Sequence, residues 1–332
     1  MPGDIVVAAL GGTIASARPS SGGVAPSLTA QDLIDAVPGL PPHVEALSFR
    51  SLPGSSVTVP DLMALHELLE QRFAAGAAGA VVTQGTDTIE ESAYAMDLVH
   101  RGPQPIVVTG AMRNPMTAGP DGPANLLAAV TVAGSPLARD LGCVVVFADE
   151  IHPASRVRKT HSTSTGTFVS VDGGPLGYLV EGSPVVVNPR AARHTLPRPA
   201  SRPRIAVYTA TLGDDGAPLE ALAGAVDGLV IAGFGVGHVP AGWTPLIDSL
   251  CARMPVVLAT RTGSGPVLRH TYGYPGSESD LRRRGLISAG FLHPYKARLL
   301  LQFALAAGAN PAQLTAAFDV AGQVSSSERW PF

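Results

Sequence analysis

Short apolar runs alternate along the chain with longer stretches in which apolar residues recur at helical spacing. The runs predict strands at residues 4–10, 45–49, 79–83, 105–109, 143–147, 205–209, 228–232 and 255–259. The stretches between them predict helices at residues 29–37, 60–73, 88–100, 125–134, 219–225, 243–253, 295–307 and 311–321. Apolar strands that alternate with helices are typical of a parallel sheet covered on both faces. The pattern therefore predicts an α/β protein.

Residues 189–204 interrupt this alternation. Proline and arginine dominate the segment, which contains no predicted helix or strand and has the composition of a linker between domains. We therefore predict two α/β domains. Residues 1–188 form the larger N-terminal domain, with a parallel sheet of the flavodoxin-like kind, and residues 205–332 form a smaller C-terminal α/β domain.

Composition excludes several classes of protein. The chain has 332 residues, of which 45% are hydrophobic, so it can bury two cores. Its net charge of -3 and its single short basic run, at residues 282–284, argue against nucleic-acid binding. No apolar run approaches the ~20 residues of a membrane helix. A strand begins at the fourth residue with no basic region before it, so we expect no secretory signal and a cytoplasmic location.

The chain also lacks the motifs of cofactor and metal enzymes. Cys143 and Cys251 stand far apart in the sequence, which predicts two free thiols and no metal-ligand spacing. The glycines at residues 11–12 and 233–237 lack the spacing of a dinucleotide-binding loop. We therefore expect no cofactor, and a nucleotide-dependent enzyme is the weaker alternative.

Hydroxyl groups follow two of the predicted strands directly. The first strand runs into Gly11-Gly12-Thr13, and the strand at 79–83 runs into a polar segment that contains Thr86 and Asp87. Ligands of open α/β sheets bind at the carboxyl ends of the strands, so we expect the two strand ends to form one site. Helix capping is the alternative for the second segment, because Thr88 and Glu91 have the spacing of a capping box.

A threonine nucleophile needs a group that takes its proton. Thr13 has no histidine or acid beside it in the sequence, so its base must come from elsewhere in the fold. Of 23 basic residues, only Lys159 and Lys296 are lysine. A lysine can lose its proton in an apolar pocket whereas an arginine cannot, which makes Lys159 a candidate base. The alternative is an ordinary surface lysine.

The segments that carry these residues resemble the two signatures of the bacterial-type L-asparaginase family. The signatures correspond to residues 9–15 (Ala-Leu-Gly-Gly-Thr-Ile-Ala) and to residues 81–91, which include Gly85-Thr86-Asp87-Thr88. Similarity continues, in the same order along the chain, at residues 110–113, 121–126, 159–160, 174–178 and 294–298. The resemblance thus spans almost the whole chain.

The resemblance implies an enzyme that hydrolyses the side-chain amide of asparagine to aspartate and ammonia. It implies that Thr13 is the nucleophile and forms a β-aspartyl ester, which water then cleaves. Thr86, Asp87 and Lys159 match the second catalytic group of the family. There, Lys159 and Thr86 would transfer protons, and Asp87 would also face the α-ammonium of the substrate.

The resemblance also implies where the substrate is held. Ser55, with Ser56 beside it, matches the serine that binds the α-carboxylate. Glu278 matches an acid that a neighbouring subunit contributes to the substrate amine, and His238 stands where many members carry an asparagine from the adjacent subunit. The implied protein is a homo-oligomer, a dimer or tetramer, that binds small-molecule L-asparagine at a subunit interface.

Two positions depart from the family pattern. The loop at residues 16–28 contains no aromatic residue, whereas the loop of the family carries a tyrosine that contacts the nucleophile. Gln84 stands where the family has a histidine. Two alternatives therefore stay open, a dual glutaminase-asparaginase and a ligand-binding homologue with weak turnover. Sequence does not separate asparagine from glutamine, because one methylene group contributes only ~1–3 kcal/mol of discrimination.

Overall fold

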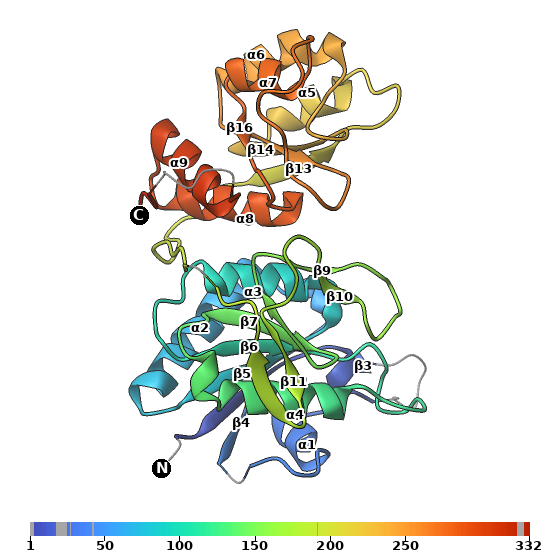
Figure 1. The fold of residues 1–332 in the computed structure, drawn as a ribbon, viewed down its shortest axis with the longest axis vertical. Helices are drawn as coiled ribbons and strands as arrows, with labels where there is room; N and C mark the ends of the chain where they lie inside the picture. Colours follow the sequence, from blue (N-terminus) through green and yellow to red (C-terminus); the bar gives the residue numbers. More distant parts are fainter. Residues whose placement is uncertain (1–2, 18–24, 27, 42, 191, 324–328) are drawn as a thin grey trace. The chain divides into compact units, whose positions relative to one another are not determined.

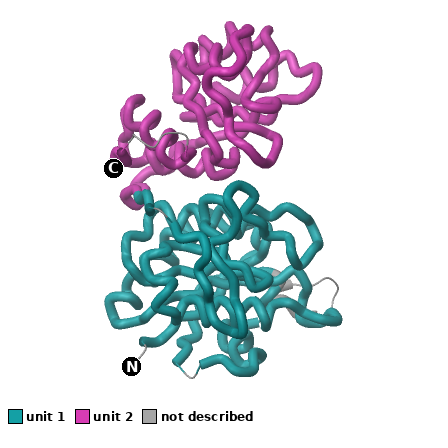
Figure 2. The backbone as a smooth tube through the Cα atoms, viewed as in Figure 1, with its two compact units in different colours: residues 1–195 teal, residues 196–332 magenta. Residues whose placement is uncertain are grey.

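The computed structural model describes residues 3–17, 25–26, 28–41, 43–190, 192–323 and 329–332. These residues form two compact units, 1–195 and 196–332, which Figure 2 shows in two colours. The change from one unit to the other falls inside the segment predicted as a linker. The first part of that segment belongs to unit 1 and is bonded to the rest of it. Arg190 pairs with Asp97, and Arg193 donates to the carbonyl oxygen of Gly102. The linker itself stays a prediction.

Unit 1 is built on an eight-stranded sheet in the order β12-β11-β8-β7-β6-β5-β1-β4 (Figure 1). Five neighbouring strands, from one edge of the sheet inward, are parallel. They are β4 (Val44–Leu52), β1 (Ile5–Gly11), β5 (Gly79–Thr83), β6 (Ile106–Thr109) and β7 (Cys143–Phe147). Every residue of β1, β5, β6 and β7 is buried, which explains their uninterrupted apolar sequences.

Three antiparallel strands extend this parallel core. They are β8 (Glu150–Pro153), β11 (Gly177–Val180) and β12 (Ser183–Val186). The sheet is therefore mixed and mostly parallel, rather than wholly parallel as the sequence pattern predicts. A separate antiparallel pair joins β9 (Val157–Lys159) to β10 (Phe168–Ser170), and a second joins β2 (Ser16–Ala17) to β3 (Ala25–Pro26).

Helices cover both faces of the sheet, as predicted. On one face α4 (Gly122–Ala133) packs against β5, β6 and β7, and α1 (Ala30–Asp35) packs against β4. On the other face α3 (Ile89–Asp97) packs against β7 and against α2 (Val59–Ala74) (Figure 1). Residues such as Val7, Val81 and Val107 form one core cluster with Leu126 of α4. This core fixes the strand ends that carry the predicted site.

Unit 2 contains a smaller, fully parallel sheet in the order β13-β14-β15-β16. Its strands are β13 (Ile205–Thr209), β14 (Gly228–Gly233), β15 (Val256–Thr260) and β16 (Ile287–Ser288). Its helices are α5 (Ala217–Ala223), α6 (Thr244–Cys251), α7 (Glu278–Arg283), α8 (Pro294–Ala306) and α9 (Pro311–Ala321). The predicted class, two α/β domains with the larger one N-terminal, is confirmed.

Two further expectations can be compared with the described residues. Cys143 and Cys251 are both free thiols, as predicted. No helix within the described ranges has the length and apolar character needed to cross a membrane.

Candidate active site

Three glycines hold three strand ends of unit 1 against one another. Gly12 follows β1, Gly54 follows β4, and Gly85 follows β5. A Cβ atom added to Gly12 would lie 2.0 Å from the backbone nitrogen of Gly85, and one added to Gly54 would lie 2.9 Å from the Gly85 carbonyl oxygen. Gly12 also has a φ of 86°, in the left-handed region. No other residue type fits at these contacts, so the glycines bring the three chain segments into direct backbone contact.

Each of these glycines opens or precedes a single turn of 3-10 helix that carries hydroxyl groups. The turns are η1 (Thr13–Ala15), η2 (Gly54–Ser56) and η3 (Thr86–Thr88). The two strand ends that the sequence predicts to share a site are therefore adjacent, and the segment that carries Ser55 and Ser56 joins them. For Thr13 the structure describes the backbone, and its side chain lies outside the described part.

Lys159 contacts both predicted polar residues of η3. Its Nζ atom lies 2.9 Å from Thr86 Oγ1 and 3.3 Å from Asp87 Oδ1. The lysine comes from β9, which packs against α3, so a separate part of the chain delivers it to this strand end. Thr86 is 6% exposed, and the side chain of Lys159 is 17% exposed. Lys159 is therefore half-buried and bonded to both residues, and its catalytic role stays a prediction.

Asp87 is placed differently from its neighbour Thr86. Its side chain is 59% exposed although it pairs with Lys159. An ionised carboxylate has several acceptor positions, so Asp87 can bind the lysine and a second cation at the same time. More than half of the Asp87 side chain is therefore open to solvent.

Thr88 links η3 to η2 instead of capping a helix. Its hydroxyl donates to the carbonyl oxygen of Gly54 at 2.9 Å and accepts from Gln84 Nε2 at 3.3 Å. It makes no side-chain capping bond to α3, so the capping alternative is wrong for this residue. Gln84 is fully buried beneath the turn. Gln84, which stands where the family has a histidine, thus supports the segment that carries Ser55 and Ser56 through Thr88. Both serines are exposed.

The other two predicted site residues meet in unit 2. His238 Nε2 lies 3.2 Å from Glu278 Oε2, and the other carboxylate oxygen accepts from the backbone N–H groups of Thr271 and Tyr272. Burial raises the pKa of the Glu278 carboxyl, but these backbone bonds and the bond from His238 outweigh it and hold the pKa below its usual range. Glu278 is therefore ionised at neutral pH. His238 Nδ1 also lies 2.8 Å from the hydroxyl of Tyr274, a residue that sequence reasoning did not select.

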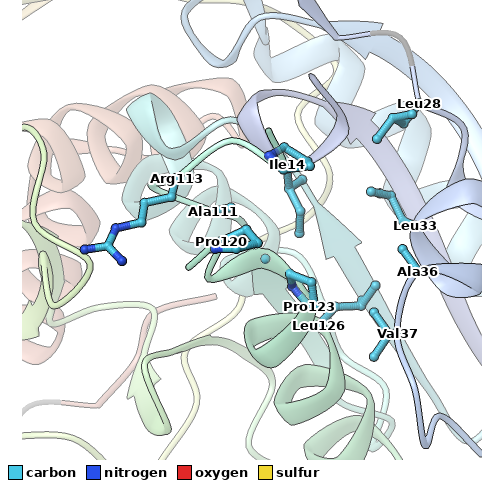
Figure 3. Close-up of a pocket in the computed structure, with 12 residues that line it drawn as sticks. Ile14, Leu28, Leu33, Ala36, Val37, Ala111, Arg113, Pro120, Pro123 and Leu126 are labelled. Atoms are coloured by element: carbon cyan, nitrogen blue, oxygen red, sulfur yellow. The ribbon is translucent and has the colours of Figure 1, made fainter. Parts of the chain in front are cut away.

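An apolar cavity lies next to η1 but does not include the polar groups described above. It has a volume of ≈ 60 Å³, and Figure 3 shows Ile14, Leu28, Leu33, Val37 and Leu126 along its walls. Among the described residues that line it, Arg113 alone is charged. The bonded group of Lys159, Thr86 and Asp87 therefore lies outside this cavity. Within the described ranges, histidine, cysteine and acidic side chains form no group that could hold a metal ion.

Comparisons with known proteins find relatives that match both units of the chain. Residues 4–192 match the family described as Asparaginase, N-terminal, and residues 204–318 match the Glutaminase/Asparaginase C-terminal domain. The chain is 40% identical over 309 residues to a probable L-asparaginase of Deinococcus radiodurans, covering 90% of this chain and 92% of that protein. It is 34% identical over 253 residues to L-asparaginase 2 of Escherichia coli, covering 73% and 70%.

A solved structure gives the same result for the fold. The crystal structure of a probable cytoplasmic L-asparaginase from Campylobacter jejuni matches with a TM-score of 0.85 at 30% sequence identity. The match covers 95% of this chain and 99% of that chain.

Proposed function

Because this chain belongs to the glutaminase/asparaginase family, we propose that it hydrolyses the side-chain amide of L-asparagine to L-aspartate and ammonia. The observation that carries the proposal is the hydrogen bond from Lys159 Nζ to Thr86 Oγ1, at a strand end that touches the backbone of the Thr13 segment. A proton-transfer pair and a second threonine then lie at one edge of the sheet.

In the proposed reaction Thr13 is the nucleophile. Its hydroxyl oxygen attacks the amide carbon, the proton is taken up on the Lys159–Thr86 side, and ammonia leaves with a proton returned from the site. The resulting β-aspartyl ester is cleaved by water, whose oxygen enters the new carboxylate while Thr13 regains its proton. A lysine suits this role because its neutral amine can accept a proton and its ammonium can return one.

Recognition of the zwitterionic substrate uses the exposed groups around this pair. Asp87 accepts from the α-ammonium, and Ser55 and Ser56 donate to the α-carboxylate. The exposure of all three residues supports this assignment. Glu278 and His238 serve the amine from a neighbouring subunit, so the proposed enzyme is a homo-oligomer, either a dimer or a tetramer, located in the cytoplasm. It needs no cofactor.

An ammonia-release assay with L-asparagine, D-asparagine and L-glutamine tests the proposal and sets the asparagine-to-glutamine preference. Thr13→Ala and Lys159→Met should each abolish most of the ammonia release. Thr131→Ala is the matched control, because the Thr131 hydroxyl donates to the carbonyl oxygen of Leu127 in its own helix. Undiminished turnover in both site variants would sink the proposal. Tight L-aspartate binding without hydrolysis by the unmodified protein would favour a ligand-binding homologue.

A further inference from the structure

Lys159 stands on a hairpin that leaves the main sheet of unit 1. The chain passes from β8 into β9, turns back into β10 and then returns to the sheet at β11. The strands β9 and β10, both labelled in Figure 1, pair with each other in a two-stranded sheet of their own. We call residues 157–170 the lysine hairpin. The position of Lys159 therefore depends on how this hairpin is attached to the rest of unit 1.

The register of the lysine hairpin shows which of its faces is turned inward. Lys159 lies opposite Phe168, and Val157 lies opposite Ser170. Opposite residues of an antiparallel pair have their side chains on the same face, and so do residues two apart along a strand. The two pairs therefore lie on one face. Val157, Phe168 and Ser170 are buried, whereas Val169 on the other face is 39% exposed. Lys159 thus stands at the end of a buried face.

Two contacts attach this buried face to the main sheet. The ring of Phe168 packs against Phe147 of β7, with centroids 4.7 Å apart. The hydroxyl of Ser170 lies 3.0 Å from Nδ1 of His152 in β8, and His152 is 0% exposed. Apolar packing is non-directional, whereas a hydrogen bond weakens steeply when its distance or angle changes. The bond between Ser170 and His152 therefore fixes the hairpin more closely than the ring contact does.

A third contact ties the hairpin to α3. Arg158 Nε lies 3.9 Å from Glu90 Oε2, and their side chains are 20% and 8% exposed. The attraction between two charges changes only slowly with their separation, so this ion pair tolerates small shifts of the strand. Of the three contacts, the bond between Ser170 and His152 is therefore the most sensitive to the position of the hairpin.

The hydrogen bond of Lys159 is equally sensitive to position. Its Nζ atom lies 2.9 Å from Thr86 Oγ1, and a displacement of ~1 Å away from Thr86 would take this pair beyond hydrogen-bond distance. Ser170 stands two residues along β10 from the partner of Lys159, which is ~7 Å at the usual rise of a strand. A shift of the hairpin at Ser170 is therefore transmitted to Lys159 over a short, hydrogen-bonded piece of backbone.

We propose that His152 and Ser170 are positioning residues, whose hydrogen bond holds the lysine hairpin where Lys159 reaches the hydroxyl of Thr86. They act through the backbone of the hairpin and not by contact with the substrate. The inference rests on the proposed function, which makes Lys159 the proton-transfer group. It adds a buried hydrogen bond behind the site to the residues that the site itself contains.

The kinetic test removes this hydrogen bond from either side. Ser170→Ala should lower kcat for L-asparagine about tenfold and leave KM within about twofold, because the hairpin carries the proton-transfer group while the proposed substrate ligands stand on η2 and η3. His152→Phe should have the same effect. The double variant should lose little more than either single one, because the two residues form one bond. Ser170→Thr keeps the hydroxyl and should keep most of kcat.

Ser288→Ala is the matched control for the cost of losing a buried hydroxyl. Ser288 is 4% exposed, as Ser170 is, and its hydroxyl accepts from the backbone N–H of Gly290 in unit 2. The control should lower the melting temperature about as much as Ser170→Ala does, but it should leave kcat unchanged. A merely structural role of Ser170 would make the two variants alike in both measurements.

A second readout needs no turnover. The chain contains only two lysines, Lys159 and Lys296, so protein labelled with ¹³C,¹⁵N-lysine gives two side-chain signals in NMR spectra. Lys159→Arg identifies the signal of Lys159, and Thr86→Val shows where that signal lies when its hydroxyl partner is removed. In Ser170→Ala the Lys159 signal should move toward this second position. The signal of Lys296, which is buried in unit 2, should stay in place.

Four outcomes would overturn the inference while leaving the proposed function standing. They are an unchanged kcat in Ser170→Ala, an unmoved Lys159 signal, an equal loss of kcat in Ser288→Ala, and additive losses in the double variant. Circular dichroism checks the folding of each variant, and His152→Phe decides if Ser170→Ala does not fold. Failure of the unmodified protein to release ammonia from L-asparagine would instead contradict the proposed function. The Lys159 signal would then decide by itself whether the hydrogen bond positions the lysine.

Discussion

The strand ends of unit 1 and the hydrogen-bonded side chains Glu278, His238 and Tyr274 of unit 2 are polar sites built in opposite ways. In unit 1, backbones touch: Gly12, Gly54 and Gly85 approach so closely that no Cβ atom fits, and the polar side chains stand on the short turns that follow. In unit 2, side chains touch, and a fully buried carboxylate is connected to the surface by an imidazole and a phenol. The unit 1 site should be disrupted when a Cβ atom is added to one of its glycines. The unit 2 site should be disrupted when one hydrogen-bonding atom is removed from a side chain.

The largest expected effect is that of an added methyl group, in Gly12→Ala. The new Cβ would lie 2.0 Å from the Gly85 nitrogen at a φ of 86°, so the strand ends must separate. We expect a loss of at least about 4 kcal/mol in the free energy of unfolding, together with the loss of ammonia release. Urea unfolding measures the first quantity.

Gly39→Ala is the control for this variant. Gly39 has a φ of 82°, almost that of Gly12, but an added Cβ would meet nothing within 4 Å. Its cost should be the conformational term alone, ~1–2 kcal/mol. Equal destabilisation by the two variants would show that the backbone contact of Gly12 with Gly85 contributes nothing.

The next effect concerns the proton-transfer pair. Lys159→Arg keeps the positive charge beside Thr86 and Asp87 but removes a group that can become neutral. We expect kcat to fall by ~10²- to 10³-fold, with little change in the melting temperature. Steady-state ammonia release gives kcat. If the variant keeps more than a tenth of the activity, Lys159 supplies charge and not proton transfer.

A smaller effect is expected from the side-chain hydrogen bonds of Thr88, which connect two of the strand ends in unit 1. Thr88→Val removes the hydroxyl that joins Gln84 to the Gly54 carbonyl, and so loosens the turn that presents Ser55. We expect KM for L-asparagine to rise about tenfold, with a loss of ~1–2 kcal/mol in stability. Thr88→Ser should restore both quantities. A valine variant with an unchanged KM would mean that η2 holds its position without this bond.

The same contrast explains what sequence reasoning could find. Buried parallel strands are read from continuous apolar runs, and a Gly-Thr pair after such a run marks a strand end, so the segments of Thr13 and Thr86 were predictable. Gly12 touches Gly85 because β1 and β5 are neighbours in the sheet. No local sequence pattern predicts which strands are neighbours. The antiparallel strand β12 was missed because its sequence, Ser-Pro-Val-Val, is short and contains a proline.

Side-chain relays are harder to predict than strand ends. The spacing of Thr88 and Glu91 predicts a capping box, but a tertiary contact with Gly54 takes the hydroxyl instead. Tyr274 has no signal in periodicity or spacing, because its partner His238 lies 36 residues away in the chain. Only the family resemblance indicated Glu278 and His238. Local sequence therefore predicts the fold and the unit 1 site better than it predicts the contacts among Glu278, His238 and Tyr274.

The smallest expected effect comes from a pair of buried histidines, His66 and His100, of which His66 also lies 3.8 Å from the half-exposed carboxylate of Glu70. In unit 1, His66 Nε2 lies 3.3 Å from His100 Nδ1, and His100 Nε2 lies 2.7 Å from the carbonyl oxygen of Gln104. A carbonyl only accepts, so His100 Nε2 carries its proton, and Nδ1 must stay unprotonated to accept from His66. Burial lowers the pKa of His100 in agreement with this arrangement.

The His66–His100 pair should affect the stability of the fold and not the binding of L-aspartate. Because the folded protein binds the His100 proton less readily than the unfolded chain does, stability should fall as the pH drops below about 6.5 and level off below the folded pKa. We expect the free energy of unfolding to be ~1 kcal/mol lower at pH 5 than at pH 7 because of this histidine. In His100→Phe that part of the difference should disappear. L-aspartate binding at pH 7 should be unchanged in this variant. If the unmodified protein and His100→Phe have parallel pH profiles, His100 is not the titrating group. If aspartate binding is weakened in the variant, the buried histidine pair also affects the ligand site.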